Sequence, residues 1–141
     1  MDIKALEDYI RRMPERLNRA VKQSLEMASF ETESRLSRLF KTEGRSEGVE
    51  WSPLKEKYLL WKVKKGFSEK KLHKTATLAQ SFTSVLKGDE AVVGTPVGYA
   101  IYHEHGTEHI PRRPFMEPVF RAMTKRLPEI FKQNLKEVLN V

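Results

Sequence analysis

Three histidines, His103, His105 and His109, lie within seven positions of the stretch YAIYHEHGTEHIPRRPF, residues 99–115. Imidazole nitrogens and neighbouring carboxylates are side chains that bind zinc. A helix would place His103 and His105 on different sides, and Gly106, a typical helix terminator, separates His105 from His109. The spacing fits no standard zinc pattern such as HExxH. We therefore expect no metal, although a turn could still bring some of these side chains together.

No other motif in the sequence predicts catalysis. The 141 residues include no cysteine, which removes thiol nucleophiles, thiolate metal ligands and disulfides, and favours a reducing compartment such as the cytoplasm. No serine stands in a Gly-x-Ser-x-Gly turn, and no glycine-rich phosphate loop follows a predicted strand. We expect no catalytic residue and no cofactor. A metal-dependent hydrolase built on the histidines stays open as an alternative.

Residues 99–106 predict a short helix. Tyr99, Ala100, Tyr102 and His103 would form one of its faces, and Gly106 would end it in the left-handed conformation that glycine adopts at low cost. His103, flanked by apolar positions, is expected to be a structural residue with locally hydrogen-bonded ring nitrogens.

The following residues predict a stiff corner. A residue that precedes a proline is kept out of the helical region, so Pro111 and Pro114 would hold Arg112 and Arg113 extended. We expect Arg113 on the surface, where its guanidinium can bind a carboxylate or carbonyl of a neighbouring subunit. Phe115 would be delivered into the core or into a neighbour.

Long amphipathic helices are expected at both ends of the chain. A short helix at about 2–12 should precede a longer one that begins near Pro14, because proline fits the first helical turn. At about 26 residues the longer helix would measure roughly 40 Å, so part of its apolar stripe could face another subunit. A further helix should occupy the C-terminal segment, with Pro128 as a predicted kink. The stripes comprise Leu17, Val21, Leu25, Ala28, Thr32, Leu36 and Leu39, and Val119, Met123, Leu127, Ile130, Asn134, Leu135 and Val138.

The middle of the chain combines a loop, a helix and a hairpin. Two glycines without apolar periodicity predict a flexible surface loop at about 41–50. Ser52 should cap a helix that has Pro53 at its first position and ends at Gly66. Alternating residues around Gly88 predict a hairpin at about 81–95. We predict a single domain, 1–141, of the α+β class, with long terminal helices packed around a small antiparallel sheet.

Residues 45–75 hold most of the net charge of +7, with nine basic and four acidic side chains. Lysines alternate there with Trp51, Tyr58, Trp61 and Phe67, a mixture that can bind phosphates and stack on bases. The simpler interpretation is a lysine-coated surface helix whose aromatic side chains face inward. The N-terminus lacks the apolar core of a signal peptide, and no stretch is apolar enough to span a membrane. We expect a soluble protein that is not exported by a cleaved signal.

Five short motifs follow one another between Trp51 and about Val119: W-S-P-L, L-x-x-T-x-x-L-x-x-S, V-G-T, Y-A-x-x-H-x-x-G and P-R-R-P-F. Their order resembles the bacteriophage virion morphogenesis family, the tail completion proteins of Mu-like phages and prophages. Ala76 departs from the family's pattern, which usually has glycine after the threonine. We interpret the main motif positions as structural or interface residues: Trp51, Pro53, Leu54, Tyr99, His103, Gly106, Arg113, Pro114 and Phe115. The remaining motif positions include Leu72, Thr75, Leu78 and Ser81.

The resemblance implies a structural virion protein rather than an enzyme. Such a protein would act in tail completion or head–tail joining, as a homo-oligomeric ring that docks on other tail or head–tail connector proteins. It would be found in the host cytoplasm during assembly and then in the tail or neck of the virion. The alternative is a nucleic-acid-binding module that uses residues 45–75, and a weak DNA contact through this lysine-rich segment is compatible with both.

Overall fold

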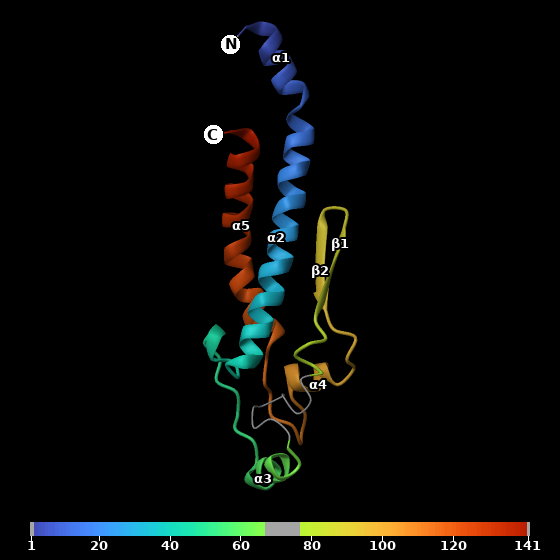
Figure 1. Cartoon of the computed structure of the whole chain (residues 1–141), viewed down its shortest axis with the longest axis vertical. Helices are drawn as coiled ribbons and strands as arrows, with labels where there is room; N and C mark the ends of the chain where they lie inside the picture. Colours follow the sequence, from blue (N-terminus) through green and yellow to red (C-terminus); the bar gives the residue numbers. More distant parts are fainter. Residues whose placement is uncertain (1, 67–76, 141) are drawn as a thin grey trace.

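The computed structural model describes residues 2–66 and 77–140 as an α+β structure with two long helices side by side (Figure 1). The predicted fold class is confirmed. A short helix, α1 (Ile3–Arg11), leads into α2 (Met13–Lys41), and α5 (Met116–Leu139) ends the described chain. Between them lie the 3-10 helix η1 (Arg45–Glu47), α3 (Glu56–Lys64), the strands β1 (Thr83–Lys87) and β2 (Glu90–Gly94), and α4 (Ala100–His105).

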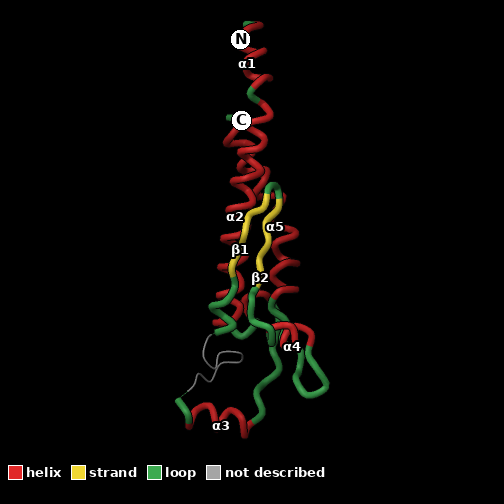
Figure 2. Tube along the Cα trace, turned by 90° about the vertical axis from the view of Figure 1, so that its right-hand side faces the viewer, coloured by secondary structure: helices red, strands yellow, loops and turns green. Residues whose placement is uncertain are grey.

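The first two helices form a nearly continuous rod. The carboxylate of Asp2 caps α1 by accepting a hydrogen bond from the backbone N–H of Ala5 over 2.7 Å. Pro14 stands in the first turn of α2, as predicted. Backbone hydrogen bonds from Arg12 to Asp8 and from Arg16 to Arg12 carry the helical pattern across the junction. As a result α1 extends the direction of α2 and lies beyond the C-terminal end of α5 (Figures 1 and 2).

Small side chains allow α2 and α5 to pack closely. Ala20 and Ser24 of α2 are buried, and Nδ2 of Asn134 on α5 donates to Oγ of Ser24 over 3.1 Å. The predicted stripe is confirmed in the second half of α2, where Ala28, Thr32, Leu36 and Leu39 are buried. It is wrong toward the N-terminus, where Leu17 is exposed and Ala20 and Ser24 take the inward positions. On α5 the helix continues through Pro128.

The predicted hairpin is also confirmed. β1 and β2 pair in antiparallel register, with Lys87 opposite Glu90 and Gly88 at a φ of 58° in the turn between them. The two strands lie alongside α2 (Figure 2). Val93 is partly buried against the core, whereas Val85 and its partner Val92 share the outer face and are about half exposed. One face of the hairpin is therefore covered and the other is open.

An aromatic cluster closes the core where α2 ends and α5 begins. The ring of Phe40 contacts those of Trp51, Phe82 and Phe115 at centroid distances of 5.4, 5.7 and 5.5 Å. Phe82 and Phe115 also meet edge to face at 5.5 Å. These rings come from α2, from the segments before α3 and β1, and from the start of α5, so the cluster ties the distant parts of the chain together.

The segment 41–50, predicted as a flexible loop, has a defined backbone here. The N–H of Gly44 donates to the carbonyl of Leu39 and that of Glu43 to Phe40, which is the bond pattern of a Schellman helix end. A Cβ on Gly44 would stand 2.5 Å from the carbonyl oxygen of Val49. The structure gives this segment a defined turn, and its flexibility in solution stays a prediction.

Helix α3 begins later than predicted. Its N-cap is Lys55, and Ser52 and Pro53 lie before the helix. The predicted capping role of Ser52 is wrong, because the helix begins only at Glu56. The backbone carbonyls of Ser52 and Pro53 accept hydrogen bonds from a distant arginine. The end of the helix is close to the prediction, with Lys64 as its last residue and Gly66 at a φ of 76°.

We expect Phe115→Ala to lower the free energy of unfolding by about 3–5 kcal/mol, because it removes a ring that is 1% exposed from the aromatic cluster. Chemical denaturation of purified protein measures the change. Phe30→Ala is the matched control: the Phe30 side chain is 74% exposed, and its removal should change stability by less than about 1 kcal/mol. Equal losses in the two variants would contradict the placement of Phe115 in the core.

Candidate functional site

The carboxylate of Glu104, on α4, caps the N-terminus of α5. Its Oε2 accepts hydrogen bonds from the backbone N–H groups of Phe115 and Met116 over 2.9 and 3.0 Å, and its Oε1 accepts from that of Glu117 over 3.0 Å. The first N–H groups of a helix have no partner within the helix and carry partial positive charge, which a carboxylate neutralises. Glu104 is buried, so this is an internal anion at a helix end and not a vacant binding site.

The side chain of Arg113 is a clamp within the chain. Its Nε donates to the carbonyl oxygen of Ser52 over 3.0 Å and its Nη2 to that of Pro53 over 3.2 Å. The residue is 6% exposed, so the prediction that Arg113 lies on the surface is wrong. Burial of a charged group is favourable only when hydrogen bonds satisfy it, and the two carbonyls supply them. Arg113 therefore holds the segment before α3 against the corner.

A second bond joins the same two segments in the opposite direction. Nε1 of the buried Trp51 donates to the carbonyl oxygen of Pro114 over 2.8 Å. The backbone N–H of Arg113 in turn donates to the carbonyl of His103 over 2.8 Å. Segments about 60 residues apart are thus joined by reciprocal bonds, in which each contributes side-chain donors to backbone acceptors of the other.

Gly106 permits this close approach. Its φ is 74° and its ψ is 167°, an extended conformation at positive φ that glycine alone adopts readily. The prediction of a positive φ is confirmed, while the predicted left-handed helical conformation is wrong because of this ψ. A Cβ would stand 3.0 Å from the backbone nitrogen of Arg112 and 3.2 Å from its Cα. The chain doubles back against itself at this point.

The buried side of α4 does not coincide with the predicted face of Tyr99, Ala100, Tyr102 and His103. Ala100 and Glu104 are buried, whereas Tyr99 and Tyr102 are about half exposed. The rings of Tyr99 and His103 meet edge to face at 5.8 Å. Burial lowers the pKa of His103, and the charge of Arg113 lowers it further, so the neutral imidazole is favoured. Its buried Nδ1 has no hydrogen-bond partner among the described residues, contrary to the predicted local bonding.

The histidine stretch does not form a ligand cluster in the part of the chain that the structure describes. No group of three histidine, aspartate or glutamate side chains in residues 2–66 and 77–140 is close enough to hold a metal ion. His105 and His109 are exposed, and the one buried carboxylate nearby, Glu104, is occupied by the helix end. These side chains therefore offer a fold-stabilising arrangement and no coordination shell.

The two aromatic side chains of α3 lie at the surface. The rings of Tyr58 and Trp61 stack at 5.8 Å with 17° between their planes, and each is about 40% exposed. The interpretation that the aromatic residues of the basic segment face inward is therefore wrong for this pair and holds for Trp51, which lies before α3. Nζ of Lys62 lies 5.6 Å from the centre of the Tyr58 ring. Helix α3 occupies the end of the molecule opposite α1 (Figure 1).

The remaining motif positions surround this corner or lie outside it. Leu54 is partly buried before α3, and Pro114 is partly buried beside Trp51. Leu78 is buried, and Oγ of Ser81 donates to its carbonyl over 2.7 Å. Leu72, Thr75 and Ala76 lie outside the described residues. The role of Glu104 was not predicted from the sequence. The available signal was indirect: Phe115, the N-cap residue of α5, has no side chain that can cap the helix, so a carboxylate from another segment was needed.

Comparison with known proteins gives one family. A model of the phage virion morphogenesis family matches residues 1–136. The chain is also 31% identical over 96 residues to an uncharacterized protein of Methanocaldococcus jannaschii, and the aligned region covers 64% of this chain and 71% of that protein. No solved structure matches the chain.

We expect Arg113→Ala to destabilise the fold by about 2–4 kcal/mol, because the carbonyls of Ser52 and Pro53 lose a charged donor and the buried side chain leaves a void. Arg112→Ala is the neighbouring control. The Arg112 side chain is half exposed, pairs with the exposed Glu117 and donates its Nε to the carbonyl of Glu104 over 3.1 Å, so its loss should cost about 1 kcal/mol, less than that of Arg113. Thermal and chemical unfolding measure both variants. An Arg113→Ala protein as stable as the wild type would contradict the clamp.

Glu104→Ala should cost about 2–4 kcal/mol, since three backbone donors at the start of α5 lose a charged acceptor. Glu108→Ala, which removes an exposed carboxylate four residues further on, should leave stability within about 0.5 kcal/mol. Amide hydrogen exchange adds a local readout: in Glu104→Ala the N–H groups of Phe115, Met116 and Glu117 should exchange faster. Unchanged exchange at these three positions would rule out the cap.

Proposed function

The chain belongs to the phage virion morphogenesis family, and from this membership we propose that it acts in tail completion or head–tail joining. The proposed activity is structural: copies of the chain oligomerise as a ring and dock on other tail or head–tail connector proteins. The family match over residues 1–136 carries the proposal, because it spans nearly the whole chain rather than one motif.

The distribution of exposed apolar side chains supports a role in assembly. Ile3 and Ile10 on α1, Val85 and Val92 on the hairpin, and Phe120 on α5 are between 45 and 77% exposed. Clusters of exposed large apolar side chains are typical of protein interfaces. They lie on several sides of the molecule, which suits a subunit that contacts both its own copies and other proteins.

An enzymatic role has no comparable support. The phage virion morphogenesis family is a structural one. At the corner, the carboxylate of Glu104 and the guanidinium of Arg113 are already bonded to the chain itself. No helix among the described residues has the length and apolar character required to cross a membrane. We place the protein in the host cytoplasm during assembly and in the tail or neck of the finished virion.

Deletion of the gene from the phage or prophage that carries it should abolish complete, infectious particles, because unjoined heads and tails would accumulate. Electron microscopy of lysates counts joined and separate parts, and plaque assays count infectious particles. Supply of the wild-type chain from a plasmid should restore both counts, and the Phe30→Ala plasmid tests whether a folded surface variant also does so. Normal yields of infectious particles without the protein would overturn the proposal.

Nucleic-acid binding is the second candidate, and the exposed Tyr58 and Trp61 stack on a lysine-rich helix favours it. Binding through phosphates weakens steeply as salt rises, whereas an apolar interface does not. Fluorescence anisotropy with single-stranded and duplex DNA at increasing salt distinguishes binding through phosphates from binding through an apolar interface. Affinity that is lost in Trp61→Ala and falls steeply with salt would support this candidate, and no binding at low salt would exclude it.

A further inference from the structure

We propose that α1 of one copy docks, as a helix, into an apolar groove between α2, β2 and α5 of the next copy. This inference rests on the proposed function, because it assigns the two surfaces through which the proposed oligomer forms. The two surfaces are different, so the contact is head to tail rather than symmetric.

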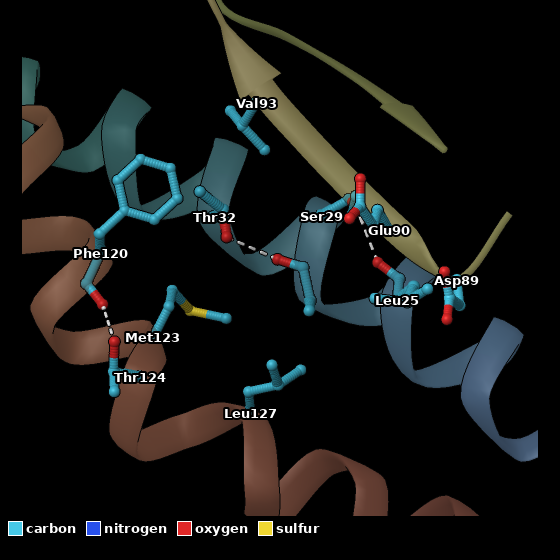
Figure 3. Close-up of a pocket in the computed structure, with 12 residues that line it drawn as sticks. Leu25, Ser29, Thr32, Asp89, Glu90, Val93, Phe120, Met123, Thr124 and Leu127 are labelled. Carbon is cyan, nitrogen blue, oxygen red and sulfur yellow. Dashed lines mark hydrogen bonds between the residues drawn. The ribbon is translucent and has the colours of Figure 1, made fainter. Parts of the chain in front are cut away.

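The groove is open, mainly apolar and measures about 380 Å³ (Figure 3). Such a volume lies in the range of sites that bury side chains of a ligand. A second depression continues it along α2 toward the hairpin turn, since both include Leu25 and Asp89. The apolar lining comprises Leu25 and Ala28 of α2, Ala91 and Val93 of β2, and Phe120, Met123 and Leu127 of α5.

The hydroxyl groups in the groove are already satisfied by their own helices. Oγ of Ser29 donates to the carbonyl of Leu25 over 2.8 Å, and Oγ1 of Thr32 donates to that of Ala28 over 2.7 Å. Thr124 makes the same bond to Phe120 over 2.8 Å, and Figure 3 shows all three bonds. With these donors used, the walls present methyl and methylene groups. An apolar side chain can therefore enter without leaving these hydroxyl donors unpaired.

Helix α1 has the matching chemistry, and its apolar side chains are left exposed by the described part of its own chain. It buries no residue, and Ile3, Leu6 and Ile10 are 77, 47 and 60% exposed. Their spacing of three and four places them on one face, which is the pattern of anchors in helix-in-groove recognition. The opposite face carries charged residues.

Charge sets the direction of the docked helix. Asp89 and Glu90 stand at the hairpin end of the groove, and Arg11 and Arg12 stand at the C-terminal end of α1. Docking with the arginines toward the hairpin turn places opposite charges together. The pair that Arg11 makes with Asp8 spans 3.6 Å between well-exposed side chains, so it is weak and can be exchanged.

The groove of the same chain is out of reach for α1. Helical backbone bonds at Arg12 and Arg16 keep α1 in line with α2, and α1 lies beyond the tip of the hairpin (Figures 1 and 2). If α1 folded back onto its own groove, the chain would have to bend near Pro14 and these backbone bonds would break. A neighbouring copy requires no such change, and repetition of a head-to-tail contact gives a ring where the rotation closes and a filament where it does not.

The test uses one variant for each surface, with sedimentation velocity over a range of protein concentrations. Ile10→Asp places a charge on the apolar face of α1, and Leu127→Asp places one on the half-exposed wall of the groove. Each should weaken association by roughly 30-fold or more, as at a central interface position. Ala5→Asp and Gln133→Asp introduce the same carboxylate on other faces of the same helices and should associate like the wild type. Circular dichroism and thermal unfolding confirm that each variant is folded.

Mixing the two defective variants distinguishes a head-to-tail contact from a symmetric one. The Ile10→Asp chain keeps an intact groove and the Leu127→Asp chain keeps an intact α1, so an equimolar mixture should form a 1:1 heterodimer and grow no further. Removal of the rim charges by Asp89→Asn with Glu90→Gln should weaken association and reduce its salt dependence. Arg11→Gln with Arg12→Gln should do the same, and the two effects should not add.

Three outcomes would overturn the inference: a wild-type chain that stays monomeric at the highest soluble concentration, folded Ile10→Asp or Leu127→Asp variants that associate normally, or a mixture that stays monomeric. The proposed function is tested separately by particle counts in the deletion strain. If Ile10→Asp restores infectious particles and still oligomerises, this contact is wrong and the role in assembly stands. If the deletion itself has no effect, the role fails whatever the oligomeric state.

Discussion

The structure depends on one ionic contact, the Glu104 carboxylate at the N-terminus of α5. The start of this long helix is partly buried, and its first N–H groups have no partner within the helix. Glu104 satisfies three of them and thereby fixes α4 relative to α5. With both ends of the 106–114 segment held, the chain between them must turn sharply at Gly106. This turn places the Arg113 side chain against the carbonyl of Ser52, before α3, and brings the ring of Phe115 into contact with that of Phe40.

The two long helices obey a different constraint. Toward the N-terminus of α2 their contact is made by small residues and a polar pair, Ala20, Ser24 and Asn134. Further along, large apolar side chains such as Leu36, Val119 and Ile130 fill the contact. Small-residue packing buries little apolar area per residue, so the hydrophobic stabilisation is concentrated toward the end that holds the aromatic cluster. Among the described residues the opposite end has no such cluster, and the apolar residues of α1 remain exposed.

Local signals in the sequence predicted what local interactions determine. The hairpin follows from alternation around Gly88, and the separation of α1 from α2 follows from Pro14. The start of α3 did not follow, because Ser52 is a good cap in isolation but its carbonyl bonds to Arg113, 61 residues away. Glu104 was missed for the same reason, since its partners lie 11 to 13 residues ahead across a reversal of the chain. The ψ of Gly106 depends on the approach of Arg112, which no residue pattern encodes.

The positions that carry the family resemblance are mostly interior, and this limits what the resemblance can specify. Trp51, Arg113 and Phe115 are nearly inaccessible, and the side-chain donors of Trp51 and Arg113 bond to the chain's own backbone. A motif made of such residues identifies a fold, since each of them is required for the corner to close. It cannot by itself identify a partner, because a partner contacts exposed atoms. The exposed apolar and aromatic side chains lie mostly outside the motif, on α1, on the outer face of the hairpin and on α3, so any specificity for a partner would depend on these surfaces rather than on the buried motif residues.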